Sequence, residues 1–174
     1  MSIKIKLTNG AKELTKGSEF STGLDLRARG YSTILKSKES KNIISEPIWF
    51  DDNIKSITIK PLQRILIKTG VHIQPDEPEK LEDGSLLIID TEINNRSGLT
   101  LKEGILCHLG IIDSDFRNDV GCSIINLSEE DYTINENDAI GQLCFKYAVI
   151  PNIIYTDELN STDRGLNGFG SSGK

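Results

Sequence analysis

The sequence of 174 residues has few cysteines, few histidines and no long apolar run. Its three cysteines, Cys107, Cys122 and Cys144, form neither a Cys-x-x-Cys pair nor a zinc-ligand spacing, which argues against a disulfide framework and a zinc site. No stretch approaches the roughly 20 apolar residues that a membrane-spanning helix needs. The net charge of −6 argues against broad binding to nucleic acid or to an anionic membrane surface. We therefore expect a cytoplasmic protein whose cysteines are reduced and buried.

The sequence instead contains many short segments in which apolar and polar residues alternate. Alternation at every second position is typical of β-strands, and many short strands with turn residues between them indicate an all-β barrel or sandwich. The length suits one domain with its own core. One short helix is expected over residues 97–104, with Ser97 as its N-cap and Gly104 at its end. The predicted strands cover residues 3–7, 24–28, 56–60, 64–74 with a break at Gly70, 86–93, 105–112, 120–126, 132–134 and 139–151.

The segment of residues 110–121 carries more charge than a turn requires. An apolar run leads into Asp113, and a second apolar run begins at Val120, which predicts a β-hairpin. Its turn contains Asp113, Asp115 and Asp119, whereas an ordinary turn needs one Asp or Asn and a Gly. One of these carboxylates could act as a general base while another orients an arginine or a metal ion. A solvated acidic turn is the alternative interpretation.

Two other segments offer groups that could bind an anion. Arg96, Ser97 and Gly98 open the predicted helix, where free backbone amides and a hydroxyl suit a phosphate; an ordinary N-cap beside a solvated arginine is the alternative. Gln142 lies in an apolar run, where its amide needs a partner. That partner could be another core or interface group.

The glycine-rich residues 164–174 contain matches to two phosphate-binding motifs, GxGxxG and GxxxxGK. Both motifs need a helix after the glycines, and the given sequence ends at Lys174, so we expect neither a dinucleotide-binding fold nor a P-loop. Glycine amides, serine hydroxyls and Arg164 could still hold phosphate. A disordered Gly/Ser tail is the alternative, although it would need neither Arg164 nor Phe169.

Five stretches, taken in order, resemble the five motifs of the trimeric deoxyuridine triphosphate nucleotidohydrolases (dUTPases) of phage or bacterial type. They are residues 23–28 (GLDLRA), 96–99 (RSGL), 110–117 (GIIDSDFR), 138–143 (DAIGQL) and 164–173 (RGLNGFGSSG). The resemblance implies a dUTPase-like β-barrel with jelly-roll character over residues 1–161. It also implies a homotrimer in which a flexible arm, residues 162–174, closes over a neighbouring subunit's active site.

The resemblance further implies hydrolysis of dUTP to dUMP and pyrophosphate, with Mg2+ on the triphosphate. Asp113 matches the aspartate that activates the attacking water, and Asp25 would support the metal through its water shell. The uracil ring would be read by backbone groups of the hairpin between Leu106 and Asn126. The matched substrate-binding residues are Arg96, Ser97, Gly98, Gly110, Phe116, Gln142, Arg164, Phe169, Gly170, Ser171 and Ser172.

Three features depart from the family pattern. Phe116 stands where the family usually has tyrosine; its ring would still pack under the deoxyribose, and we expect selectivity against UTP to be retained. Ala139 and Gly141 replace commoner residues of the fourth motif. Residues 30–55, with Trp49 and Phe50, form an extra segment; residues 31–55 could bind a regulatory protein, as in some phage-type members, or could be a surface excursion whose aromatic residues pack on the barrel.

Two other functions compete with dUTP hydrolysis. A dCTP deaminase would share the fold, but its second motif usually has paired serines and a further arginine, whereas this chain has Ser97 and Gly98. A trimer that uses nucleotide only as a switch for a protein partner is the non-enzymatic alternative. The complete set of matched catalytic residues favours the enzyme.

Overall fold

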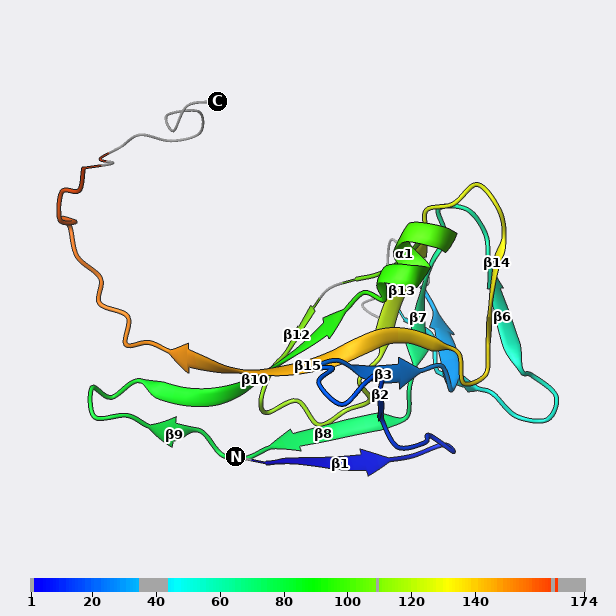
Figure 1. The fold of residues 1–174 in the computed structure, drawn as a ribbon, viewed down its shortest axis with the longest axis horizontal. Coiled ribbons are helices and arrows are strands. Elements are labelled where there is room, and N and C mark those ends of the chain that lie inside the picture. Colours follow the sequence, from blue (N-terminus) through cyan, green and yellow to red (C-terminus); the bar gives the residue numbers. More distant parts are fainter. Residues whose placement is uncertain (1, 35–43, 109, 164, 166–174) are drawn as a thin grey trace.

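A computed structural model describes residues 2–34, 44–108, 110–163 and 165 (Figure 1). The described part is mostly β-structure with one short helix, which confirms the predicted all-β class. It contains no helix that is long and apolar enough to cross a membrane. The strands are β1 Ile3–Leu7, β2 Thr15–Lys16, β3 Leu24–Arg27, β4 Gly30–Thr33, β5 Ile48–Trp49, β6 Ser56–Ile59, β7 Arg64–Lys68, β8 Val71–Pro75, β9 Glu79–Lys80, β10 Leu86–Asn94, β11 Ile105–Cys107, β12 Gly110–Ile112, β13 Cys122–Asn126, β14 Tyr132–Asn135 and β15 Ala139–Ile150; the helix is α1 Ser97–Glu103.

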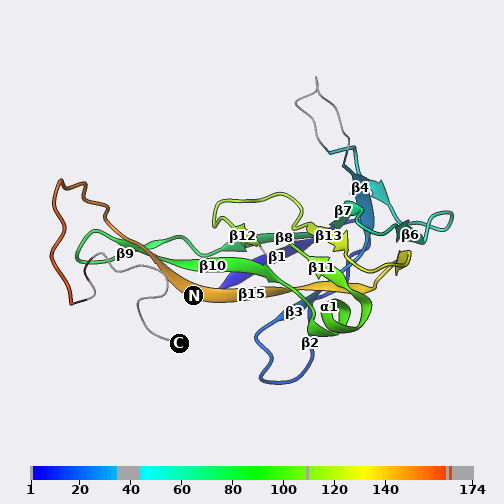
Figure 2. The same ribbon diagram turned by 90° about the horizontal axis from the view of Figure 1, so that it is seen from above.

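Two sheets contain most of the strands. One has the order β12-β10-β15-β3-β2, with β9 also paired to β10, and the other has the order β11-β13-β7-β4-β5. Separate two-stranded ribbons pair β1 with β8 and β6 with β14. In two perpendicular views, β10 and β15 run side by side as a long ribbon (Figure 1, Figure 2). Every residue of β10 has a partner in this ladder, from Leu86 opposite Ile150 to Asn94 opposite Gln142.

Alternate residues of these strands form one hydrophobic core. In β7, Ile65 and Ile67 are buried while the residues between and beside them are more exposed, as a period of two requires. Burial of each such side chain contributes about 1.5–3 kcal/mol relative to an exposed one. Other large members of the core, with 0–2% of their surface exposed, are Leu26, Ile59, Ile73, Ile105, Ile124, Ile134 and Leu143.

The N-cap of helix α1 lies one residue earlier than predicted. Arg96, not Ser97, occupies the N-cap position, with extended backbone angles and no side-chain hydrogen bond to the helix amides. The predicted C-terminal boundary is confirmed: Gly104 has a φ of 65°, in the left-handed region that glycine adopts at little cost. The amides of the first turn therefore have no capping side chain.

The strand predicted over residues 105–112 is wrong, because two separate strands occupy that range. Strand β11 pairs with β13, whereas β12 pairs with β10 in the other sheet. The hairpin is consequently formed by β11 and β13, extended by a bond from the His108 amide to the Ser123 carbonyl, at 2.7 Å. Residues 105–112 are apolar almost throughout, so the sequence pattern does not reveal the change of sheet.

The extra segment contributes to the main structure. Residues 30–34 and 44–55 are described, and β4 and β5 belong to the five-stranded sheet. Phe50 is 5% exposed and packs near Tyr31, with ring centroids 6.1 Å apart. Part of the predicted excursion is thus core; residues 35–43 lie outside the described part. A short strand, β9, lies between β8 and β10 in the sequence and pairs with β10.

We predict that Asn126→Leu lowers the free energy of unfolding by about 3 kcal/mol. The Asn126 side chain is fully buried, and its Nδ2 donates to the carbonyls of Ile59 (3.0 Å) and Glu130 (2.7 Å). Leucine would remove the donor to the Ile59 carbonyl and also the acceptor of the Ser128 amide and hydroxyl. Urea denaturation provides the measurement. Ser128→Ala, which leaves both donors in place, is the control and should cost about 1 kcal/mol; equal losses in the two variants would contradict the prediction.

Candidate active site

The first, second and fourth motifs meet around Asp25. Asp25 lies on β3 directly opposite Gln142 on β15. Arg96 Nε is 3.7 Å from Asp25 Oδ1, and Arg27 Nη2 is 3.8 Å from Asp25 Oδ2. Only 16% of the Asp25 side chain is exposed, so the two guanidinium groups neutralise a largely buried carboxylate. Asp25 thereby forms one polar cluster with Arg96 and Gln142, which lie 71 and 117 positions further along the sequence.

The start of α1 is open to an anion. Arg96 Nη1 donates to the Ala139 carbonyl at 2.8 Å, which fixes the entry of the helix against β15. Ser97 and Gly98 are exposed, and a Cβ added to Gly98 would meet no atom within 4 Å. The first turn has no acidic residue. Its uncapped amides and the Ser97 hydroxyl can therefore donate to a negatively charged group.

Gln142 lies against Gly23. A Cβ on Gly23 would be 3.1 Å from Gln142 Cδ and 3.2 Å from its Oε1, so a larger residue would force this side chain to shift by a few tenths of an ångström. Within the described part of the chain, the Gln142 amide has no hydrogen-bonding protein partner. The core partner that we considered is not found there, and the amide is available to a ligand. The sequence identified Gln142 as a candidate binding residue, but it did not reveal that the Gln142 side chain packs against Gly23.

Gly141 leaves space for two cysteine thiols. A Cβ at this position would lie 3.2 Å from Cys122 Sγ and 3.3 Å from Cys107 Sγ. The cysteines are free, as predicted; Cys107 and Cys122 are buried and Cys144 is half-buried. A hydrogen bond with Cys107, together with burial, raises the pKa of the Cys122 thiol well above its usual range. Glycine in place of a larger motif-four residue thus accommodates the sulfur pair.

The third motif forms a separate turn after β12. The Phe116 amide donates to the Asp113 carbonyl at 2.9 Å, so the predicted base and the predicted sugar-binding ring stand at the two ends of one β-turn. The Arg117 side chain folds back over this turn, and its Nη1 donates to the carbonyls of Ser114 (2.7 Å) and Phe116 (3.0 Å). Asp113 is exposed, and Phe116 is 38% exposed. Gly110 is at the start of β12, with open space beside its Cα.

Within one chain, this turn does not reach the polar cluster. Strand β12 is three strand positions from β3, which at the usual spacing corresponds to roughly 14 Å. Asp113 follows the residue paired with Thr91, whereas Gln142 is paired with Asn94, which adds roughly 14 Å along the strands. No hydrogen bond or ion pair in the described part connects Asp113 or Phe116 with the cluster. The predicted site residues therefore fall into two groups.

Asp119 anchors the end of the same loop. Its carboxylate is 7% exposed and accepts bonds from the amides of Gly70 (2.5 Å) and Thr69 (3.4 Å). Lys68 Nζ lies 3.3 Å away. Asp119 is thus a buried structural carboxylate, and not part of a solvated turn. The sequence feature that could have indicated its burial is its position directly before the apolar run that begins at Val120.

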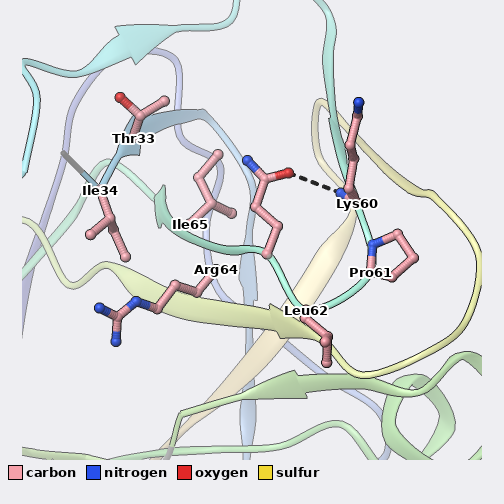
Figure 3. A pocket seen from close by; sticks show the side chains of 8 residues that line it. Thr33, Ile34, Lys60, Pro61, Leu62, Arg64 and Ile65 are labelled. Atoms are coloured by element: carbon pink, nitrogen blue, oxygen red, sulfur yellow. Dashed lines mark hydrogen bonds between the residues drawn. The ribbon is translucent and has the colours of Figure 1, made fainter. Parts of the chain in front are cut away.

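A hollow of about 770 Å³ lies away from both groups, beside the turn at Pro61. Its wall includes Lys60, Arg64 and Thr33, and Gln63 accepts a bond from the Lys60 amide at 2.9 Å (Figure 3). None of the predicted site residues lines it. The size of a hollow therefore does not identify the site of this protein, and the polar cluster remains the candidate.

Part of the predicted site belongs to the C-terminal arm. Arg164, Phe169, Gly170, Ser171 and Ser172 lie outside the described residues. The described part also contains no group of three or more His, Cys, Asp or Glu side chains that could hold a metal ion. Asp25 is the carboxylate that the cluster could offer to a hydrated metal.

Comparisons with known proteins agree on one family. A family model described as dUTPase matches residues 53–173. The deoxyuridine 5'-triphosphate nucleotidohydrolase of Treponema denticola is 34% identical and covers 99% of both chains; that of Fusobacterium nucleatum is 39% identical over 70% of this chain and 79% of its own. A solved dUTPase of Staphylococcus bacteriophage 80alpha, with dUpNHpp, has a TM-score of 0.72 at 19% identity and covers 99% of both chains. That likeness confirms the predicted dUTPase-like fold.

We predict that Gly141→Ala lowers the free energy of unfolding by about 1–3 kcal/mol, because the added methyl group is forced against two sulfur atoms. Cys122→Ala removes one of these atoms. The double variant should therefore lose less stability than the sum of the two single losses. Urea denaturation of the four proteins gives this coupling energy. Additive losses would show that the thiols do not restrict the position.

Proposed function

The chain belongs to the dUTPase family and is a dUTP diphosphatase, and we propose that Asp113 activates the water that attacks the α-phosphorus of dUTP. The observation that carries the proposal is the polar cluster of Asp25, Arg96 and Gln142 beside the uncapped start of α1. It supplies positive charge and hydrogen-bond donors suited to a triphosphate.

Binding of the phosphate chain falls to this cluster. Ser97 donates its hydroxyl, and the first amides of α1, including that of Gly98, donate to phosphate oxygens. Gln142 reaches a phosphate or the attacking water from across β15. Arg96 orders the site through its bonds to Asp25 and to the Ala139 carbonyl. Developing negative charge on the phosphates is thereby met by donors that are already in place.

Mg2+ fits this donor set as an ion carried by the substrate. The cluster offers one carboxylate, Asp25, which is already paired with two arginines, so it suits a water-mediated contact better than a protein cage. Bound to the triphosphate, Mg2+ would neutralise phosphate charge and make the α-phosphorus more electrophilic. A solved dUTPase of phage phi11, 16% identical to this chain with a TM-score of 0.66, is described with a structural Mg(II) ion.

Asp113 and Phe116 act on the other end of the substrate. A carboxylate is a weak base, so most of the acceleration comes from positioning and charge neutralisation. Phe116, at the far end of the same turn, packs under the deoxyribose. Its ring leaves no room for a 2′-hydroxyl group, which favours dUTP over UTP. The hairpin of β11 and β13 reads the uracil through its backbone.

Each active site is shared between subunits of a homotrimer. The roughly 14 Å that separate the turn from the cluster in each of two directions support this arrangement, because one chain cannot bring both groups to one α-phosphorus. The C-terminal arm, residues 162–174, completes the site. Its Arg164, Ser171 and Ser172 hold the γ-phosphate, and Gly170 supports the close approach of Phe169 to the uracil ring.

Binding of a regulatory protein through residues 31–55 is a second candidate role. Phe50 packs in the core, which assigns this aromatic residue to the fold and not to a partner. Among the described residues of the segment, the large apolar side chains open to a partner are those of Ile44, Ile48 and Ile54, which are 51%, 39% and 38% exposed. A partner surface here would use them, and any test must leave β4 and β5 intact.

We predict that Asp113→Asn lowers kcat for dUTP by about 10²-fold or more while the melting temperature stays unchanged, because the amide cannot accept the proton. Pyrophosphate release in the presence of Mg2+ is the measurement. UTP, dTTP and dCTP serve as substrate controls, and we expect dUTP to be strongly preferred. Wild-type turnover in the variant would assign the base elsewhere, and ammonia release from dCTP would point to a deaminase.

Shared sites predict complementation between two inactive variants. Asp113→Asn removes the turn's base, and Arg96→Ala disrupts the cluster; each homotrimer should be inactive. After co-refolding in equal amounts, about one quarter of the sites combine an intact turn with an intact cluster from the neighbouring subunit, and should restore about that share of activity. Absence of recovery, with mixed trimers demonstrated by differential tags, would place each site within one chain.

A further inference from the structure

His72 connects the β1–β8 ribbon to the loop that carries Asp113 and Phe116. It is half-buried on β8, and its Nδ1 lies 3.1 Å from the Arg117 carbonyl oxygen. Its Nε2 lies 3.2 Å from the Thr8 hydroxyl, on the end of β1. A carbonyl oxygen can only accept, so Nδ1 carries the proton and donates to Arg117. The single proton of the Thr8 hydroxyl is shared between Nε2 and the Gly70 carbonyl, which lies 3.3 Å from Thr8 Oγ1.

In the described part of the chain, the other hydrogen bonds between this loop and neighbouring elements lie at its two ends. At the entry, Ile112 is paired with Thr91 in the ladder of β12 and β10. At the exit, the Asp119 carboxylate binds the Gly70 amide, and Thr69 Oγ1 donates to the Val120 carbonyl at 2.7 Å. Within the described part of the chain, His72 is the side chain from outside the loop that bonds to residues 113–118.

The bond from His72 is made to the Arg117 carbonyl, which follows directly after the Asp113–Phe116 turn. Arg117 follows Phe116 directly, and its side chain binds the carbonyls of Ser114 and Phe116. Fixing the Arg117 peptide therefore fixes the orientation of this side chain and of the turn that it closes. The turn bond from Phe116 to Asp113 extends the restraint to the predicted base.

We propose that His72 is a positioning residue for dUTP hydrolysis, which holds the Arg117 carbonyl so that Asp113 and Phe116 keep their places relative to the substrate. The inference rests on the proposed roles of Asp113 and Phe116. Loss of one such hydrogen bond typically costs about 1 kcal/mol, equivalent to roughly a fivefold change in rate when it is felt in the transition state. Misplacement of a reacting group can increase that loss.

Two amide variants separate the two ring nitrogens. In His72→Asn, the side-chain amide nitrogen takes the position of Nδ1 and keeps the bond to Arg117; in His72→Gln, it takes the position of Nε2 and keeps only the contact with Thr8. We expect kcat of the Asn variant to stay within about twofold of the wild type, and kcat of the Gln variant to fall roughly fivefold or more. KM should change less than kcat. Thr8→Val, which removes the opposite contact, is the matched control and should retain wild-type kcat.

A readout that does not depend on turnover accompanies the kinetics. Hydrogen exchange of residues 114–118 should be faster in His72→Gln than in His72→Asn and the wild type, because the exit of the turn is released. Equal kcat values and equal exchange in the two amide variants would overturn the role of His72. A wild-type protein that fails to release pyrophosphate from dUTP would instead overturn the proposed function, so the two failures are distinguishable.

Discussion

The ladder between β10 and β15 is the constraint on which both halves of the candidate site depend. Its register places Asn94 opposite Gln142, and β3 adds Asp25 to the same row from the other side of β15. The opposite edge of β10 pairs with β12, which ends one residue before Asp113. One register thus assembles the polar cluster and also keeps Asp113 away from it. A slip of one residue would turn Gln142 to the other face of the sheet.

The sequence predicted the two strands of this ladder, but not their pairing, because the tendency to form a strand is a local property. Residues 86–93 and 139–151 are long, largely apolar segments that indicate strands, and Gly104 indicates a helix end through its left-handed backbone. The pairing of one strand with another, in contrast, depends on residues that are distant in the sequence. Nothing in residues 105–112 indicates that β11 joins β13 while β12 joins β10, and the same limit hid the structural role of Asp119, whose partners are about 50 positions earlier.

Two glycines show what motif resemblance leaves out. Gly23 belongs to the first motif, and its lack of a Cβ is explained by an amide from the fourth, since Gln142 lies within 3.2 Å of where that atom would be. Gly141 departs from the family pattern, and two thiols occupy the space that it leaves. The identity of each residue is therefore fixed by a neighbour distant in sequence. The resemblance to the family motifs predicted the residues of the candidate site, whereas the packing that orients them was learned from the structure.

The two halves of the site are supported to different degrees. Asp25 and Gln142 stand on strands paired on both sides, so their positions have the precision of a sheet interior. Asp113 stands on a loop, where precision must come from individual contacts. Two such contacts are the bond from the Gly70 amide, between β7 and β8, to the buried Asp119, and the bond from His72, on β8, to the Arg117 carbonyl. The placement of Asp113 consequently depends on residues outside the five motifs, and resemblance alone would not identify them.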